Sequence, residues 1–442
     1  MAKRTKMAEI RPFRGVHYNQ ALLKDWPDVV SPVYDIITLP QQQELYLRSD
    51  CNFVRLEFAR EMPQDTSLDN KYTRAAATLE QWLRRGVLVT DQSPAIYLYD
   101  QYFSHQGKEF RRRGLTVRVR LEEWDKMVVR PHEGTMGQPK TDRLNLLWAL
   151  QANTSPILAL YEDNGKQIAS LVMAQAKSEP LLNLKKVDGE RHRVWAITNA
   201  GAIEKIQSCL SGQPLYIADG HHRYESALAY RQQRLAASPA APEQAGFNFV
   251  MMTLVDFTDH GLLILPPHRL IRGIARPALD GLMSKLKVFF DIEELSLQAA
   301  DVWTRVDNWF EQGNDVRLVA CGLAPERLSL LRLRDPAAVS PMMPYFHSEL
   351  YKRLDVSVLE HVILEELLGL ESDHDSRLRD YVYDKQEAVN RVVALEYQLA
   401  FLLRPTRAKT IKAIADVRDR MPKKSTYFYP KLPAGLIVNR LD

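Results

Sequence analysis

The chain has 442 residues, about three times the usual length of one domain, so two or three packed units are expected. Hydrophobic residues make up 45% and charged residues 26%, values that exclude a disordered chain or a fibrous repeat. The formal net charge of +4 is small for this length and does not point to nucleic acid as a partner. An anion site must therefore come from a local cluster of basic residues.

Cysteine usage and the apolar runs indicate a cytoplasmic protein. The three cysteines, Cys51, Cys209 and Cys321, form no close pair, which is typical of a reducing compartment without a disulfide framework or a zinc ribbon. The basic start MAKRTKMAEIRPFRG is followed by no apolar run, so we expect no signal peptide. Runs such as FNFVMMTLV are far shorter than the roughly 20 residues that span a bilayer, so no membrane partner is expected.

Residues 1–128 are predicted to form an α+β region. Strands are expected at FVRLEF from Phe53, AIYLYDQYF from Ala95 and LTVRVRL from Leu115, which are rich in β-branched and aromatic residues. The intervening segment NKYTRAAATLEQWLRRG has apolar residues at helical spacing and a glycine where a C-terminal cap belongs, so it predicts a helix.

Residues 129–275 are predicted to alternate helices and strands, and residues 276–442 to be richer in helix. The middle region begins with a loop from Pro131 that is dense in Gly, Pro and charged residues. Its expected elements are a helix and a strand before Glu162, a helix around 171–177, a turn at Asp188 and Gly189, strands at HRVWAI, PLYIAD and FNFVMMTLVDF, and a helix at GHHRYESALAYRQQRLAA. Helices are expected at SVLEHVILEELLGL from Ser357 and QEAVNRVVALEYQLAFLL from Gln386. The fold class is therefore α+β with a mixed-sheet core.

The strongest candidate site is the run LYIADGHHRY, residues 215–224. A buried-type strand ends in Asp219 and Gly220, and His221, His222 and Arg223 then fall on the first turn of a helix. Helix N-termini offer N–H donors and partial positive charge, which suit a phosphate. Gly220 allows close approach of the backbone, and the arginine can bind phosphate through two bonds.

The acidic residue of this run has several candidate roles. Asp219 could accept a proton from an attacking hydroxyl, or help to hold Mg²⁺. The bland alternative is that Asp219 only caps the helix and that both histidines lie on the surface. The density of titratable groups favours function.

Two further clusters and one short motif are candidate sites. Arg130, His132, Glu133, Lys140, Asp142 and Arg143 could clamp an anion and supply a base, or could form a solvated loop. The tail MPKKSTYFYPK from Met421 has basic residues among aromatic ones. It could close a phosphate pocket, dock through its rings or bind single-stranded nucleic acid. The near-neutral net charge of the chain favours the pocket or the docking role over nucleic acid. Tyr34 and Asp35 follow a proline turn in SPVYDII, where a buried tyrosine and a turn-capping aspartate are equally expected.

The motifs that are absent narrow the reaction class. The sequence contains no G-x-G-x-x-G, G-x-x-x-x-G-K-[ST], H-E-x-x-H or G-x-S-x-G pattern. The sequence therefore lacks the usual motifs of dinucleotide oxidoreductases, Walker-type ATPases, zincins and α/β-hydrolases.

The whole chain resembles the family DUF1015. The segments that carry the resemblance are FRGVHYN, VVSPVYDII, VRPHEGTMGQPKTDRLNLL, SPILALYED, LYIADGHHRYESALAY, PPHRLI and MPKKSTYFYPKLPAGLI, in this order along the chain. The family name implies no reaction.

The DGHHR run is also similar to the signature of free serine kinases of the ParB/sulfiredoxin-like superfamily. That resemblance implies a ParB-like nucleotide-binding unit in residues 129–275 and a phosphate site lined by Asp219, His221, His222 and Arg223. Glu133 is a candidate for a second acid, although no motif shared by the two families includes it.

These observations lead to one leading hypothesis and two alternatives. The leading function is a phosphotransferase that moves a phosphoryl group from a nucleotide (ATP or ADP) or pyrophosphate to a small hydroxylated metabolite such as serine, with Mg²⁺ as a candidate cofactor held by Asp219. The alternatives are a nucleotide-binding regulator without turnover and a phosphoester hydrolase. The candidate catalytic residues are Asp219, His221, His222 and Glu133, and the candidate binding residues are Tyr34, Asp35, His132, Lys140, Asp142, Arg143, Gly220, Arg223, Tyr224, Lys423, Lys424 and Ser425. The oligomeric state is not predicted.

Overall fold

The structure, a computed structural model, describes residues 8–22, 28–134, 137–187, 189–370 and 378–441. These cluster into two compact units. Unit 1 takes residues up to 131, 135–263 and 430–442, and unit 2 takes 132–134 and 264–429. The basic N-terminus (1–7), residues 135 and 136 of the charged loop, and Asp188 of the expected turn lie outside the described residues. The region boundaries near 128 and 275 stay a prediction.

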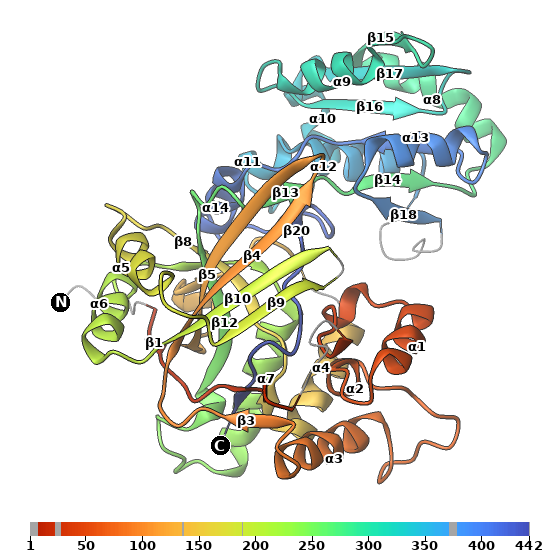
Figure 1. Ribbon diagram of the computed structural model, residues 1–442. Coiled ribbons are helices and arrows are strands. Elements are labelled where there is room, and N and C mark those ends of the chain that lie inside the picture. Colours follow the sequence, from red (N-terminus) through yellow and green to blue (C-terminus); the bar gives the residue numbers. More distant parts are fainter. Residues whose placement is uncertain (1–7, 23–27, 135–136, 188, 371–377, 442) are drawn as a thin grey trace. The chain divides into compact units, whose positions relative to one another are not determined.

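Unit 1 is built on a mixed sheet that has nine strands among the described residues. The path runs β6-β11-β8-β12-β5-β4-β10-β9, and β1 adds to β5 (Figure 1). The β6–β11 and β8–β12 pairs are parallel, and the other pairs are antiparallel. The strands are β1 Ile10–Arg11, β4 Ile96–His105, β5 Lys108–Arg120, β6 Val129–Arg130, β8 Ile157–Tyr161, β9 Leu182–Val187, β10 Glu190–Ile197, β11 Leu215–Asp219 and β12 Phe249–Asp256.

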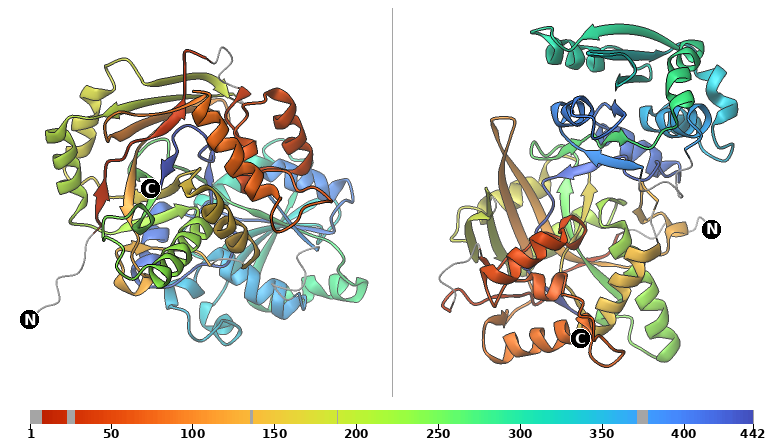
Figure 2. Two further views of the ribbon diagram at one scale, coloured as in Figure 1. Left: turned by 90° about the horizontal axis from the view of Figure 1, so that it is seen from below. Right: turned by 90° about the vertical axis from the view of Figure 1, so that its right-hand side faces the viewer.

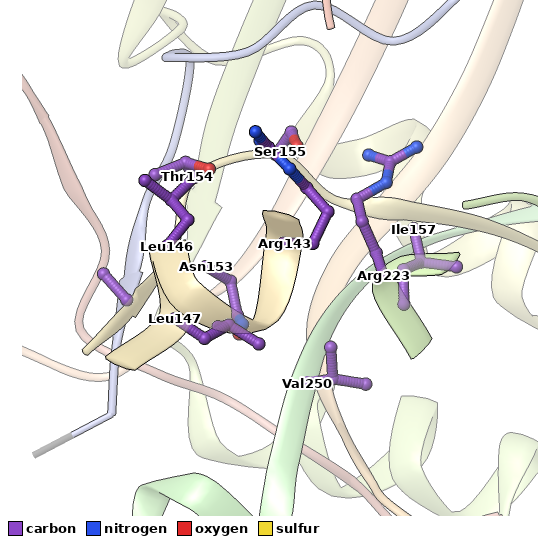
Figure 3. Close-up of a pocket in the computed structure, with 10 residues that line it drawn as sticks. Arg143, Leu146, Leu147, Asn153, Thr154, Ser155, Ile157, Arg223 and Val250 are labelled. Atoms are coloured by element: carbon purple, nitrogen blue, oxygen red, sulfur yellow. The ribbon is translucent and has the colours of Figure 1, made fainter. Parts of the chain in front are cut away.

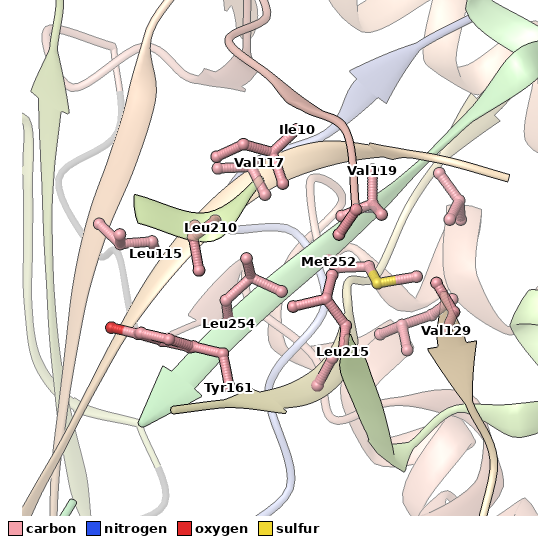
Figure 4. Close-up of a cluster of buried hydrophobic side chains, with 14 of the residues drawn as sticks. Ile10, Leu115, Val117, Val119, Val129, Tyr161, Leu210, Leu215, Met252 and Leu254 are labelled. Carbon is pink, nitrogen blue, oxygen red and sulfur yellow. The ribbon is translucent and has the colours of Figure 1, made fainter. Parts of the chain in front are cut away.

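Helices cover one face of this sheet. Alternate residues of β5 and β12, such as Val117, Val119, Met252 and Leu254, point into one core, because side chains of a strand face opposite sides in turn (Figure 4). That core also receives apolar residues of α5, α6 and α7. Helices α3, α4 and α7 pack in a row (Figure 2). The helices of unit 1 are α1 Leu39–Arg48, α2 Val54–Glu57, α3 Lys71–Arg84, α4 Gly137–Leu150, α5 Gln167–Gln175, α6 Ala200–Leu210 and α7 His221–Ala237.

The last residues of the chain return to unit 1. A small cavity lies against the other face of the sheet, which carries Tyr99. It is also lined by four residues of the returning segment, Leu432, Pro433, Leu436 and Ile437. Backbone bonds join Ala434 to Ser31 and Val438 to Val16, and β21 (Asn439–Arg440) pairs with β7 (Ala152–Asn153). Both faces of the central strands are therefore covered, which fits the uninterrupted apolar run of β12.

Unit 2 has an antiparallel sheet in the order β15-β17-β16-β19-β14-β18. Leu399 and Phe401 of β19 face one core with α8 and the π-helix Val358–Leu367, whereas Ala400 and Leu402 face a second core with α9 and α13. The strands are β14 His268–Ile271, β15 Phe290–Ser296, β16 Arg317–Cys321, β17 Arg327–Leu333, β18 Arg379–Val382 and β19 Leu399–Leu402. The helices are α8 Arg276–Phe289, α9 Val302–Glu311, α10 Pro336–Val339, α11 Glu349–Lys352, α12 Asp355–Ser357, α13 Lys385–Val393 and α14 Ala408–Asp416.

The α+β class with a mixed-sheet core is confirmed. The strands expected from Ala95, Leu115, His192, Pro214 and Phe247 are β4, β5, β10, β11 and β12, and the helices from Asn70 and Gly220 are α3 and α7. None of the described helices is long and apolar enough to cross a bilayer.

The strand expected at FVRLEF is wrong, since Val54–Glu57 is helix α2. The side chain of Asn52 accepts a hydrogen bond from Val54 N at 2.9 Å, a local turn that starts the helix despite the β-favouring residues. The helix also places Glu57, which is fully buried, next to its hydroxyl partners Thr154 and Ser155.

The helix expected over QEAVNRVVALEYQLAFLL is correct only in its first half. Helix α13 ends at Val393, and Leu395 takes a left-handed backbone conformation with φ 60°. The second half becomes β19, whose backbone pairs with β14 and β16. Sheet pairing outweighs the helical spacing there.

The core of unit 1 predicts a large effect of a single truncation. We expect Leu254→Ala, at a fully buried position, to lower the free energy of unfolding by about 2–5 kcal/mol, because it leaves a cavity among packed strands. Leu47→Ala, at a side chain that is 85% exposed, is the control and should change it by under about 0.5 kcal/mol. Urea unfolding of both variants measures the difference, and equal stabilities would contradict the core assignment.

Candidate functional site

The DGHHR run lies where the sequence places it, at the junction of a strand and a helix in unit 1. Asp219 ends β11, Gly220 takes a left-handed conformation with φ 93°, and His221 begins α7. A Cβ at Gly220 would lie 2.8 Å from Nε of Arg223, so a side chain there would displace the guanidinium. Gly220 is the N-cap residue and has no side chain, so no N-cap side chain bonds to the N–H groups of the first turn of α7.

Asp219 is largely buried, with its side chain 15% exposed, and lies between two cations. Arg223 Nη2 donates to Asp219 Oδ2 at 2.7 Å, and Lys431 Nζ donates to Oδ1 of the same carboxylate. Burial alone would raise the pKa of Asp219, but Lys431 and Arg223 hold it well below its usual range. Burial would likewise lower the pKa of Lys431, but Asp219 and Asp35 raise it. Both partners of this pair are therefore charged at neutral pH.

Arg223 also fastens the start of α7 to the sheet. Its Nη1 donates to the backbone oxygen of Pro156 at 2.6 Å, just before β8. His221 is buried beside Asp219 and contributes to its lowered pKa. His222, the next residue, is half-buried.

Residues of two other predicted clusters join this network. The 3-10 helix Tyr34–Ile36 brings Asp35 to within 4.0 Å of Lys431 Nζ. The guanidinium of Arg143 lies 3.9 Å from the ring centroid of Tyr34. Burial raises the pKa of Tyr34 to about 12, so its hydroxyl stays protonated at neutral pH.

Arg143 is held by carboxylates of α2 and α4. Its Nη1 lies 3.8 Å from Glu57 Oε1 and donates to the backbone oxygen of the same residue at 2.9 Å, and its Nε donates to Asp142 Oδ2 at 2.9 Å. Burial alone would raise the pKa of Asp142, but Arg143 and Lys71 lower it to about 2. Each of these charges is compensated by a neighbour.

Arg143 and Arg223 line one cavity, and Figure 3 shows their side chains extending in the same direction from α4 and α7. The cavity measures about 30 Å³, which is about the share of one water molecule in the liquid. A nucleotide does not fit inside it.

Two of the predicted residues in unit 1 have other partners. Lys140 Nζ lies 3.7 Å from Glu225 Oε2, and its backbone oxygen accepts the hydroxyl of Ser226. The buried hydroxyl of Tyr224 donates to Glu122 O at 2.8 Å, and its ring packs on Trp124. These contacts fasten α7 to α4 and to the loop before Trp124.

The remaining predicted residues gather in unit 2. Glu133 Oε1 accepts a hydrogen bond from Lys424 N at 2.8 Å, and His132 O accepts one from Met421 N at 2.8 Å. The His132 ring is fully buried, and its Nε2 lies 3.0 Å from Thr426 Oγ1. The segment that contains Lys423, Lys424 and Ser425 is thus fixed to the 132–133 segment within unit 2.

A buried arginine supports that segment. Arg269 Nη1 donates to Lys424 O at 2.8 Å, and its Nε donates to Glu360 Oε1 at 2.9 Å. Arg379 Nη1 donates to the other oxygen of Glu360 at 2.7 Å. The carboxylate of the π-helix therefore lies between two guanidinium groups.

Sequence reasoning missed two members of the unit 1 network. Lys431 was part of the basic and aromatic tail, but nothing in the sequence pairs it with a carboxylate 212 residues away. Glu57 lies in an apolar run, and a charge inside such a run is the signal that could have marked it. No group of three or more His, Cys, Asp or Glu side chains arranged for a metal is found among the described residues.

The sequence matches the family described as "Protein of unknown function (DUF1015)" over residues 10–357. The chain belongs to this family. A search of curated proteins gave no match.

Solved structures give distant matches. A conserved hypothetical protein from Pyrococcus furiosus has 12% identity and a TM-score of 0.35, with 74% of this chain and 95% of that chain covered. A free serine kinase in complex with AMP has 11% identity and a TM-score of 0.34, with 73% and 92% covered. SbnI with a C-terminal truncation, from Staphylococcus aureus, has 10% identity and a TM-score of 0.35, with 73% and 87% covered. TM-scores this low do not allow site residues of these proteins to be assigned to this chain. The roles proposed below therefore rest on this chain's own residues.

The ion pairs of Asp219 predict a pH-dependent stability. We expect Asp219→Asn to lower the free energy of unfolding at pH 7 by about 3 kcal/mol, because it leaves two largely buried cations without their carboxylate. The folded-state pKa is lowered, so the carboxylate stabilises the fold above its unfolded pKa of about 3.9 and loses this effect as the pH falls further. Urea unfolding at pH 7 and pH 3.5 should show a smaller difference from the wild type at the lower pH.

Asp50→Asn is the matched control. The Asp50 side chain is fully exposed and paired with Arg55, so its loss should matter by under about 0.5 kcal/mol. An Asp219→Asn protein as stable as the wild type at pH 7 would contradict the ion-pair assignment.

Proposed function

We propose that unit 1 binds the phosphate groups of a nucleotide or of pyrophosphate at the start of α7 and transfers a phosphoryl group to a small hydroxylated metabolite such as serine. The observation that carries this proposal is the largely buried Asp219 carboxylate, which lies between Arg223 and Lys431 at a helix start without a side-chain cap. Helix N–H donors and adjacent cations form a site for an anion. The DGHHR run, which resembles the signature of free serine kinases, lies at this point.

Lys431 is the cation that would meet the phosphate. Arg223 is fixed on two sides, by Asp219 and by Pro156 O, so it serves to position the helix start. Lys431 pairs with two carboxylates, those of Asp219 and Asp35. Phosphate oxygens entering the site would take over part of that pairing.

Asp219 would act as a fixed negative charge and not as a general base. Its lowered pKa makes it a weak base at neutral pH. Phosphoryl transfer tolerates this, because it depends mainly on positioning and on compensating the charge of the transferred group. In the step, the bond from the terminal phosphorus to the bridging oxygen breaks and a bond to the acceptor oxygen forms. The hydroxyl proton, which Asp219 would orient by accepting its hydrogen bond, leaves to solvent.

The two histidines of the DGHHR run and Arg143 are proposed to assist phosphate binding. His221 and His222 would donate to phosphate oxygens, and Arg143 would add positive charge to the same cavity. Glu133 lies in unit 2 with Lys423 and Lys424, and its role as a second acid stays a prediction. Substitution of Glu133 by glutamine tests that role separately.

Mg²⁺ has no place on Asp219 in this arrangement. Both carboxylate oxygens are engaged by cations, and a divalent ion beside them would be repelled. The donor set thus suits an anion, and we derive no step through a metal held by this residue.

The function predicts a product that depends on Lys431. The purified protein is incubated with ATP, ADP or pyrophosphate, Mg²⁺ and an amino-acid pool, and phosphorylated products are measured by mass spectrometry. We expect Lys431→Met and Asp219→Asn each to lower kcat by about 100-fold or more, because charge stabilisation in the site is lost. Lys205→Met, which removes an exposed lysine of α6 in the same unit, should leave the rate unchanged.

Other outcomes would select the alternatives. Tight nucleotide binding without product, even at high protein concentration, would identify a binding regulator. Phosphate released without any hydroxyl acceptor would identify a hydrolase. Lys431→Met activity equal to that of the wild type would refute the assigned site.

A further inference from the structure

Unit 2 contains a cavity that the proposed function does not use. It measures about 370 Å³, within the roughly 300–1,000 Å³ typical of small-molecule sites. Its walls come from α11 and α12, from the end of β19, and from the start of α14. Ser425 of the basic and aromatic tail also lines it.

The cavity carries more positive than negative charge. Arg353, Arg407 and Lys409 line it, are exposed, and have no ion-pair partner within the part of the chain that the structure describes. Among the described lining residues the one acid is Asp355.

The charge of that acid is already compensated. Arg404 Nε donates to Asp355 Oδ2 at 2.7 Å, and Arg404 Nη2 donates to Oδ1 at 2.8 Å. Arg317 N adds a bond to Oδ1 at 3.1 Å. Asp355 therefore cannot also neutralise the three cations on the wall.

Neutral donors accompany these cations. Arg407 is the N-cap of α14, and its side chain makes no capping bond to the helix. The N–H groups of the first helical turn are therefore not satisfied by a capping side chain. Thr410, Thr406 and Ser425 line the same space, and the last two already donate their hydroxyl protons to Ser425 O and Pro422 O. Leu354 and Val356 form an apolar part of the wall.

We propose that this cavity binds a small molecule with a diphosphate group, either free pyrophosphate or the diphosphate of a nucleotide. Three uncompensated cations match the charge of about −3 that such a group carries near neutral pH, and guanidinium groups bind phosphate oxygens in pairs. The Thr410 hydroxyl completes the coordination of an outer oxygen. The site consists of residues of unit 2 and does not rest on the function proposed for the Asp219 network.

The test uses the full chain and two local readouts. Pyrophosphate and ADP are titrated by calorimetry, and hydrogen exchange of peptides covering residues 403–412 is followed with and without each ligand. We expect saturable binding and slower exchange at the start of α14. In Arg407→Ala/Lys409→Ala, binding at this site should weaken at least about tenfold, and the slower exchange should disappear.

Matched variants separate this site from others. Lys287→Ala/Arg327→Ala removes two exposed cations of unit 2 that do not line the cavity, and it should retain both readouts. Lys431→Met should retain the protection at residues 403–412, so failure of the phosphotransferase proposal would leave this one standing. Arg353→Ala is a second variant of the cavity in case the double variant does not fold.

The outcomes are decisive in each direction. Tighter binding of ADP than of pyrophosphate would show that the apolar wall contacts the rest of a nucleotide, whereas equal or weaker binding would identify free pyrophosphate as the ligand. Unchanged affinity in the cavity variants would overturn the proposal. So would the absence of protection at residues 403–412 at millimolar concentrations of both ligands.

Discussion

The largely buried Asp219 carboxylate depends on the two cations that contact it to stay ionised, and this requirement organises the site of unit 1. Arg223 comes from the helix that follows Asp219 directly, so this half of the arrangement is local. Lys431 comes from the far end of the chain. A buried charge that loses a partner destabilises the fold strongly, so the strand end, the helix start and the returning segment must form together.

Buried polar contacts place the returning segment. Arg112 is fully buried, and its Nη2 donates to the backbone oxygen of Pro430 at 2.6 Å. Gln101 donates to the backbone oxygen of Lys431 at 3.2 Å. Two residues of the β4–β5 hairpin thus set the position of the backbone that presents the lysine. Unit 2 uses the same device, since Arg269 joins Glu360 to the backbone of Lys424.

Sequence patterns were informative where the determining interactions are local. The strand and helix around DGHHR follow from an apolar run, a glycine and helical spacing, and they form as expected. The strand predicted at Val54–Glu57 was wrong, because its β-favouring residues carry no information about the distant hydroxyls of Thr154 and Ser155 that donate to Glu57. The second half of the segment from Gln386 likewise depends on pairing with β14 and β16. The partnership of Lys431 with Asp219 was out of reach for the same reason.

The return of the chain to unit 1 has a consequence for biosynthesis. A ribosome completes the nine-stranded sheet of unit 1 and then all of unit 2 before it reaches Lys431. Until then the nascent chain carries Asp219 without one of its cations and leaves uncovered the part of the second sheet face that Leu432, Leu436 and Ile437 cover in the complete protein. Unit 1 can therefore mature only after translation of unit 2, and the exposed apolar face in the interval is where chaperones would be expected to bind.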